Sequence, residues 1–222
     1  MKKINIIYLL PEMKGASGGA KVIYNHSLKL NKIKKNISSS VIHLKKKISY
    51  KLEASLSKKL NIFKEKYSGW NPNKMKVSKF FSPNLDWFNK DINSKKKFSL
   101  DKNTDFLIIP EIWSHFPEDL NLKKKGINYG IFIQGFFHMN STSDFKKLKS
   151  SYKNAKIILI SSDYNIRCFR EMFPEFKNKI LRINFSINSN KLKISKKTNT
   201  ITYMPRKLPD HSQLLLFYLK NL

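Results

Sequence analysis

The first 44 residues carry the pattern that most constrains the fold. Residues 4–10 read INIIYLL, a continuous apolar run rich in β-branched side chains that ends at Pro11. Such runs are typical of strands buried on both faces of a parallel sheet. A glycine-containing loop follows at 14–19, apolar residues recur at helical spacing over 20–30, and residues 39–44 again favour a strand. Strand, glycine loop, helix and strand in this order predict a βαβ unit.

The same alternation returns in the second half of the chain. Apolar runs predict strands, and the stretches between them, bounded by Ser, Asp or Pro, predict helices. The predicted strands are 105–109, 129–133, 156–160 and 180–185, and the predicted helices are 144–153 and 163–173. Residues 45–104 predict a longer crossover with one or two helices and short strands. The fold class is therefore α/β, a Rossmann-like parallel sheet with helices on both faces.

The pattern also divides the chain into domains. Residues 1–185 form the predicted first domain, and residues 186–199 (SINSNKLKISKKTN) hold few large apolar groups and predict a linker. Residues 200–204 then favour a strand and 211–222 a helix. One strand and one helix cannot bury their apolar faces without partners. We therefore expect 200–222 to begin a truncated second Rossmann-like domain, in a fragment, a split reading frame or a chain with a complementary subunit.

Composition limits the classes of protein that fit. No segment approaches the roughly 18 apolar residues of a membrane-spanning helix, and the single cysteine, Cys168, reads as a small core residue in a reducing cytosol. The sequence thus predicts a cytoplasmic protein. No spacing of His, Cys or acidic residues suggests a metal site, and His43 and His115 look solitary.

The formal net charge of +29 leaves three interpretations. Only four of the 44 basic residues are arginines, whereas recognition of phosphates and bases usually favours arginine forks. A lysine-coated soluble surface therefore explains the charge better than nucleic-acid binding does. Attraction to anionic lipid stays open, which would place the protein peripherally at the inner membrane face.

Polar residues follow the predicted strands, where ligands of parallel α/β sheets bind. They are Gly18 and Gly19 after the first strand, Glu111 after 105–109, Gln134 and Gly135 after 129–133, Ser161 and Ser162 after 156–160, and Arg206 and Lys207 after 200–204. Glycine, carboxylate, amide, hydroxyl and guanidinium together suit a polyhydroxylated ligand that carries phosphate.

Each candidate has a functional and an ordinary interpretation. The glycines expose backbone N–H groups to an anion, or they form a tight turn. Glu111 binds a sugar hydroxyl or acts as a base, or it caps a helix. His138 contacts an acceptor hydroxyl, or it is a buried structural histidine. Arg206 and Lys207 neutralise a diphosphate, or they are a solvated pair.

Four segments resemble glycosyltransferases built from two Rossmann-like domains, the GT-B architecture. INIIYLLPEMKGASGGAKVIYNHSLKL resembles their opening strand, Gly-Gly loop and helix, and IFIQGFF resembles the strand ending in Gln of rhamnosyltransferase-like members. IILISSDYNIRCFREMFP is similar to their strand ending in Ser with the helix that follows. ITYMPRK resembles the first strand of their donor-binding domain. The resemblance covers about 1–44 and 105–222.

The resemblance implies a function. The N-terminal domain would hold a glycan or lipid-linked acceptor, and the C-terminal domain would hold a nucleotide-diphosphate sugar, with no cofactor and no metal. Gly18 and Gly19 would face the donor phosphates or the reacting sugar, and Arg206 with Lys207 would meet the diphosphate. The acceptor side would be lined by Gln134, Gly135, Ser161 and Ser162. The chain ends before the family's acidic donor-binding segment. The alternative is a non-catalytic basic module that binds anionic membrane or polysaccharide.

Overall fold

The computed structural model describes residues 3–12, 17–33, 35–46, 71–78, 88, 92–136, 139–140, 142, 144–185, 196, 198, 200 and 209–220. The strands are β1 (Ile4–Pro11), β2 (Ile37–Lys46), β3 (Met75–Val77), β4 (Asp105–Pro110), β5 (Asn128–Ile133), β6 (Ile157–Ile160) and β7 (Ile180–Arg182). The α-helices are α1 (Gly18–Ile33), α3 (Phe116–Asp119), α4 (Phe145–Asn154), α5 (Asp163–Met172) and α6 (Pro209–Lys220). Short 3₁₀ helices are η1 (Pro72–Lys74), η2 (Glu111–Trp113) and η4 (Pro174–Lys179).

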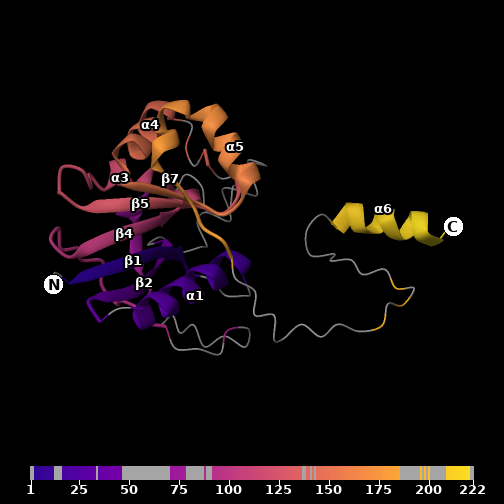
Figure 1. Cartoon of the computed structure of the whole chain (residues 1–222), viewed down its shortest axis with the longest axis horizontal. Coiled ribbons are helices and arrows are strands. Elements are labelled where there is room, and N and C mark those ends of the chain that lie inside the picture. Colours follow the sequence, from indigo (N-terminus) through magenta and orange to yellow (C-terminus); the bar gives the residue numbers. More distant parts are fainter. Residues whose placement is uncertain are drawn as a thin grey trace. The chain divides into compact units, whose positions relative to one another are not determined.

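The described strands form one seven-stranded sheet in the order β3-β2-β1-β4-β5-β6-β7 (Figure 1). Six of them are parallel, and β3 pairs antiparallel with the end of β2. The long register of β1 with β2 runs from Ile4 opposite Ile37 to Pro11 opposite Leu44. On its other side β1 pairs with β4, with Asn5 opposite Asp105. β1 is thus an inner strand from which the chain builds the sheet outward in both directions.

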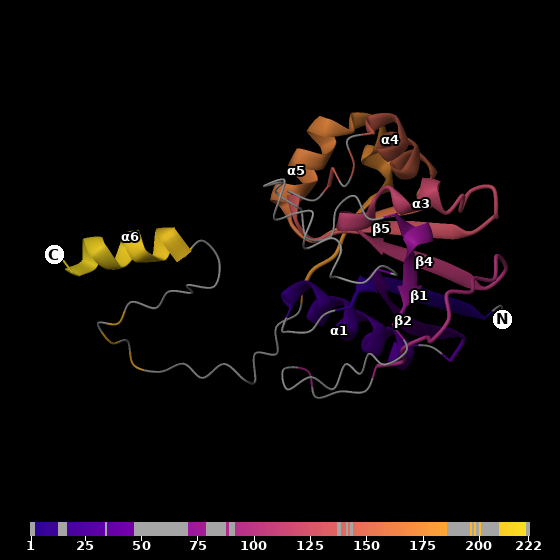
Figure 2. The same ribbon diagram turned by 180° about the vertical axis from the view of Figure 1, so that it is seen from behind.

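Helices cover both faces of the sheet because successive strand residues point to opposite sides. In β1, Tyr8 and Leu10 pack with Ile23 and Tyr24 of α1. Ile7 and Leu9 belong to the second core cluster, on the opposite face, to which η2, α4 and α5 contribute Trp113, Leu148, Tyr152 and Phe169. Figure 2 shows α3, α4 and α5 gathered near β5, away from α1. The predicted α/β fold is confirmed, and it is consistent with a Rossmann-like sheet.

Most predicted elements agree with the structure to within a few residues. β1, β4, β5 and β6 match the apolar runs, and α4 and α5 match the helices predicted at 144–153 and 163–173. The strand predicted at 180–185 is shorter, because β7 pairs with β6 only from Ile180 to Arg182. The strand predicted at 200–204 lies outside the described residues except for position 200, and α6 corresponds to the helix predicted at 211–222.

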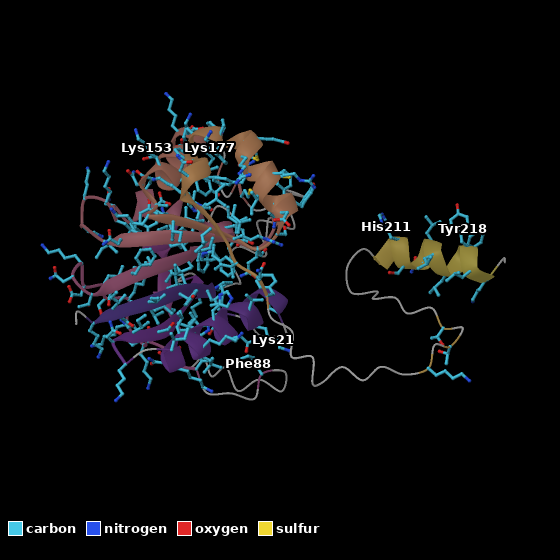
Figure 3. The ribbon with its side chains drawn as sticks, viewed as in Figure 1. Lys21, Phe88, Lys153, Lys177, His211 and Tyr218 are labelled. Carbon is cyan, nitrogen blue, oxygen red and sulfur yellow. The ribbon has the colours of Figure 1, made fainter. Side chains whose placement is uncertain are left out.

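The chain divides into two compact units, Met1–Phe185 and Ser186–Leu222. Within the second unit, α6 exposes five consecutive large apolar side chains from Leu214 to Tyr218. Tyr218 is 61% exposed and stands out from the helix in Figure 3. Among the described residues, no helix has both the length and the apolar character needed to cross a membrane.

Candidate functional site

The carboxyl ends of β1 and β4 lie at the point where the strand order reverses. β1 leads through α1 to β2 on one side, whereas β4 leads through η2 and α3 to β5 on the other. Ligands of open α/β sheets bind at this point, because the two connections run in opposite directions from adjacent strand ends. Gly18 and Gly19 begin α1, and Glu111 directly follows β4. The two glycines and Glu111 therefore lie beside the place where the strand order reverses, which we call the switch point.

The Gln134 side chain joins the end of β5 to the start of α1. Its Nε2 donates a long hydrogen bond to the Gly19 carbonyl oxygen at 3.4 Å. A Cβ added to Gly19 would lie 3.2 Å from Gln134 Oε1, which is closer than side-chain carbons normally come. Gly18 differs, because a Cβ there would meet nothing within 4 Å. A side chain at 19 would therefore displace the end of Gln134 by a few tenths of an ångström, whereas packing leaves room for one at 18.

The backbone carbonyl of Gln134 ties the end of β5 to the end of β6. It accepts from Ser161 Oγ at 3.5 Å and from Asn165 Nδ2 at 3.4 Å. Ser162 caps α5, since its Oγ accepts the Asn165 N–H at 3.2 Å. The serine that caps the helix is therefore Ser162, while Ser161 bonds to the end of β5.

Asn165 bonds to the same carbonyl, and its role was not predicted from the sequence. It lies at the third position of α5 and is buried, with 7% of its surface exposed. Side chains in a helix lean toward its N-terminus, so a polar residue in the first turn reaches back to the strand end. A polar residue three positions after the capping serine was the available signal.

The Glu111 carboxyl lies beneath the loop that follows β5. Its Oε1 accepts the Gly135 N–H at 3.1 Å, and the side chain is buried. Burial raises the pKa of Glu111 to about 7, although nearby backbone N–H groups of Glu111, Gln134 and Gly135 act to lower it. Desolvation dominates because a buried carboxylate loses more in hydration than these amides return. Near neutral pH this carboxyl exists in both protonation states.

A buried hydrogen-bonded chain fixes the segment that carries Glu111. Ser114 Oγ donates to the Glu111 carbonyl oxygen at 2.9 Å. The Tyr152 hydroxyl of α4 lies 3.1 Å from Ser114 Oγ and donates to the Met139 carbonyl oxygen at 2.9 Å. Tyr152 is fully buried, so α4 holds the loops after β4 and β5 against each other. The position of Glu111 is thereby set by packing rather than by solvent-exposed contacts.

The structure brings together most of the residues predicted for the site. Gly19, Glu111, Gln134, Gly135 and Ser161 form one connected set, here called the rim, with Asn165 added. Gly18 is exposed beside Gly19. The remaining candidates, His138, Arg206 and Lys207, lie outside the described residues. Among the described residues, no three His, Cys, Asp or Glu side chains gather in a way that could hold a metal ion.

Two histidines predicted to be solitary are not. His43 Nε2 lies 2.9 Å from the Tyr24 hydroxyl, and His43 Nδ1 lies 3.2 Å from Ser94 Oγ. Burial lowers the pKa of His43 to about 3, so the ring is neutral. His115 Nε2 lies 3.8 Å from Asp119 Oδ2. The prediction was wrong because spacing along the chain does not show partners that folding brings close.

The fold and the rim define a class: an α/β protein whose polar groups meet at the carboxyl edge of a mostly parallel sheet. Comparison with known protein families, curated proteins and solved structures finds no match. What the rim does must therefore be argued from its own chemistry.

Proposed function

We propose that the chain contains the acceptor-side domain of a GT-B glycosyltransferase, which moves a sugar from a nucleotide-diphosphate donor to a glycan or lipid-linked acceptor. The observation that carries the proposal is the rim, in which helix N-terminal amides, a carboxyl, a primary amide and a hydroxyl meet at the switch point. Neutral amides and hydroxyls exchange hydrogen bonds with sugar hydroxyls, and helix N-termini favour phosphate.

Glu111 is the base in this proposal. The acceptor hydroxyl gives its proton to Glu111, its oxygen bonds to the anomeric carbon, and the diphosphate leaves with the electron pair of the broken bond. A general base is most effective when its pKa lies near the working pH, and burial raises the pKa of Glu111 to about 7. Gln134 and Ser161 would orient the acceptor, and His138 would contact its hydroxyls.

In this proposal, residues 200–222 belong to the domain that binds the sugar donor. Arg206 and Lys207 would neutralise the departing diphosphate, with no metal and no cofactor. The exposed apolar side chains of α6 support the proposal that this helix belongs to a second Rossmann-like domain. A helix that is apolar on most sides is normally covered by a sheet or by other helices.

Two glycine variants separate ligand binding from packing. Gly18→Ala adds a methyl group where nothing lies within 4 Å, whereas Gly19→Ala crowds Gln134 Oε1 at 3.2 Å. If the N-terminus of α1 faces phosphate or the reacting sugar, Gly18→Ala should weaken donor binding while leaving the melting temperature unchanged. If the glycines serve packing alone, Gly18→Ala should leave donor binding unchanged, and Gly19→Ala should displace only the Gln134 side chain.

The decisive assay is transfer of a labelled sugar by the protein expressed from its whole reading frame, over a panel of nucleotide-diphosphate sugars and acceptors. Glu111→Gln should lower kcat by about 10²–10⁴-fold with a smaller change in KM. Glu171→Gln is the matched control, because it makes the same chemical change at an exposed position of α5. Full activity of Glu111→Gln, or no binding of any sugar nucleotide by the wild type, would refute the proposal. A non-catalytic basic module would need neither Glu111 nor Gln134.

A further inference from the structure

Lysines precede every parallel strand of the described sheet. Each of the six strands has a lysine within the three residues before its first residue: Lys3, Lys35, Lys102, Lys125, Lys156 and Lys179. Five of these side chains are exposed, and Lys179 is half-buried. Because the strands are parallel, all six lysines lie at the amino end of the sheet, which is on the left of Figure 1 beside the N-terminus. We call this end the lysine edge.

The carboxyl ends of the four strands from β4 to β7 have a different charge. The three residues that follow each of β4, β5, β6 and β7 are 111–113, 134–136, 161–163 and 183–185. None of these residues is lysine or arginine, and they include Glu111 and Asp163. Along these four strands positive charge is therefore separated from the rim, whereas the carboxyl end of β2 carries Lys45 and Lys46.

The lysines at this end are close enough to affect one another. Burial lowers the pKa of Lys179, and the charges of Lys156 and Lys153 lower it further. Lys179 Nζ donates to the Ala155 carbonyl oxygen at 2.9 Å, which fixes it at the C-terminus of α4. Lys153 and Lys177, labelled in Figure 3, come from the end of α4 and from η4.

Among the described residues, few acidic side chains lie beside these lysines, and each has another hydrogen-bond or charge partner. Asp105 is buried, accepts from Asn5 Nδ2 at 2.9 Å and lies 3.8 Å from Lys95 Nζ. Asp101 accepts the Asn103 N–H at 2.9 Å within its own turn. Glu118 accepts from Asn154 Nδ2 at 3.4 Å. These bonds do not remove the carboxylate charges, but within the described part of the chain the six lysines outnumber the three acidic residues named here.

Two large apolar side chains are exposed at the same end. Ile4, the first residue of β1, is 41% exposed, and Ile33, the last residue of α1, is 62% exposed. The Ile4 N–H donates to the Asn36 carbonyl oxygen at 2.9 Å, so the start of β1 lies beside the turn that follows α1. Apolar side chains surrounded by lysines suit a bilayer interface, where the chains enter the headgroup region and the ammonium groups meet anionic lipid. A nucleic-acid backbone offers isoleucine no comparable environment.

We propose that the lysine edge docks the protein on an anionic lipid bilayer. Lysine is a compact point charge on a flexible stem, which suits attraction to a charged surface more than the directed binding of individual phosphates. The proposal concerns the amino end of the sheet and does not depend on glycosyl transfer at the rim.

The test measures co-sedimentation of the full chain with phosphatidylcholine vesicles, with and without phosphatidylglycerol. The wild type should bind the anionic vesicles, and added salt should weaken the binding. The combined variant Lys3→Gln, Lys102→Gln, Lys125→Gln and Lys156→Gln should bind roughly a thousandfold more weakly. Lys179 is left in place because it caps α4.

The control removes the same charge from exposed lysines away from the lysine edge: Lys21→Gln, Lys74→Gln, Lys76→Gln and Lys146→Gln together. It should change binding less than about threefold if location matters more than net charge. Circular dichroism checks that both variants are folded. Ile33→Asn should weaken the binding that persists at high salt. Equal weakening in both lysine variants would overturn the proposal, as would binding of generic RNA through these lysines without binding to vesicles.

Discussion

Replacing Glu111 by glutamine should change how stability depends on pH. The carboxyl has a pKa near 4.5 when exposed, and burial raises it to about 7 in the folded chain. Below pH 4.5 both states are protonated. As the pH rises from 4.5 to about 7, the unfolded chain releases this proton while the folded chain keeps it, so the free energy of unfolding falls. Above about pH 7 both the folded and the unfolded chain have released the proton, so this contribution to the free energy of unfolding changes no further.

The size of the effect follows from the pKa difference. One pKa unit corresponds to about 1.4 kcal/mol, so a rise from 4.5 to about 7 lowers the free energy of unfolding by about 3 kcal/mol at pH 8. Glutamine cannot ionise, yet its oxygen can still accept the Gly135 N–H. We therefore expect the stability of Glu111→Gln, relative to the wild type, to increase by about 3 kcal/mol between pH 4.5 and pH 8.

Urea unfolding of both proteins across this pH range measures the difference, with circular dichroism and the fluorescence of the buried Trp113 as signals. Comparing the two proteins at each pH cancels the repulsion among the many lysines, which both share. Glu171→Gln removes one exposed negative charge and should show no comparable trend. A stability difference between Glu111→Gln and the wild type that stays constant across the range would refute the reasoning. It would show that burial does not perturb this carboxyl.

Three further predictions follow from buried groups. Gly130→Ala should lower stability by about 1–3 kcal/mol in urea unfolding, because its Cβ would lie 2.7 Å from Ile157 Cγ2, whereas Gly135→Ala should be tolerated. Ser151→Ala should raise the melting temperature, with a gain of about 1 kcal/mol, because the buried Ser151 Oγ has no hydrogen-bond partner; a lower melting temperature would contradict this. His43 should stay neutral in NMR titrations down to about pH 3, so stability should fall as pH drops below 6.5, by up to about 1.4 kcal/mol per pH unit.

The sequence predicts most of the strands and helices because strands buried on both faces of a parallel sheet consist of continuous apolar runs. β1 and β4 are recognisable without the structure, since few other elements need four or more consecutive apolar residues bounded by proline. The order of the strands in the sheet could not be predicted in this way, because no residue pattern in β4 indicates that it pairs with β1. That pairing creates the switch point.

The residues of the rim could be predicted from the sequence, but the hydrogen bonds between them could not. Strand ends in a parallel sheet must meet at one edge, so Glu111 and Gln134 could be named from their positions. The bond between Gln134 and Gly19 joins positions 115 residues apart, and no local pattern encodes it. His43 shows the same limit, because its partners Tyr24 and Ser94 lie 19 and 51 residues away. The assignments of His138, Arg206 and Lys207 stay predictions.

The length of the strands sets how far the two ends of the sheet lie apart. β1 has eight residues and therefore spans roughly 25 Å from its lysine-bearing start to its rim-bearing end. A protein attached to a bilayer by its first residues would hold its polar rim about that far above the lipid headgroups. An acceptor anchored in the same bilayer would have to extend across this gap, which several sugar units can do and a single headgroup cannot.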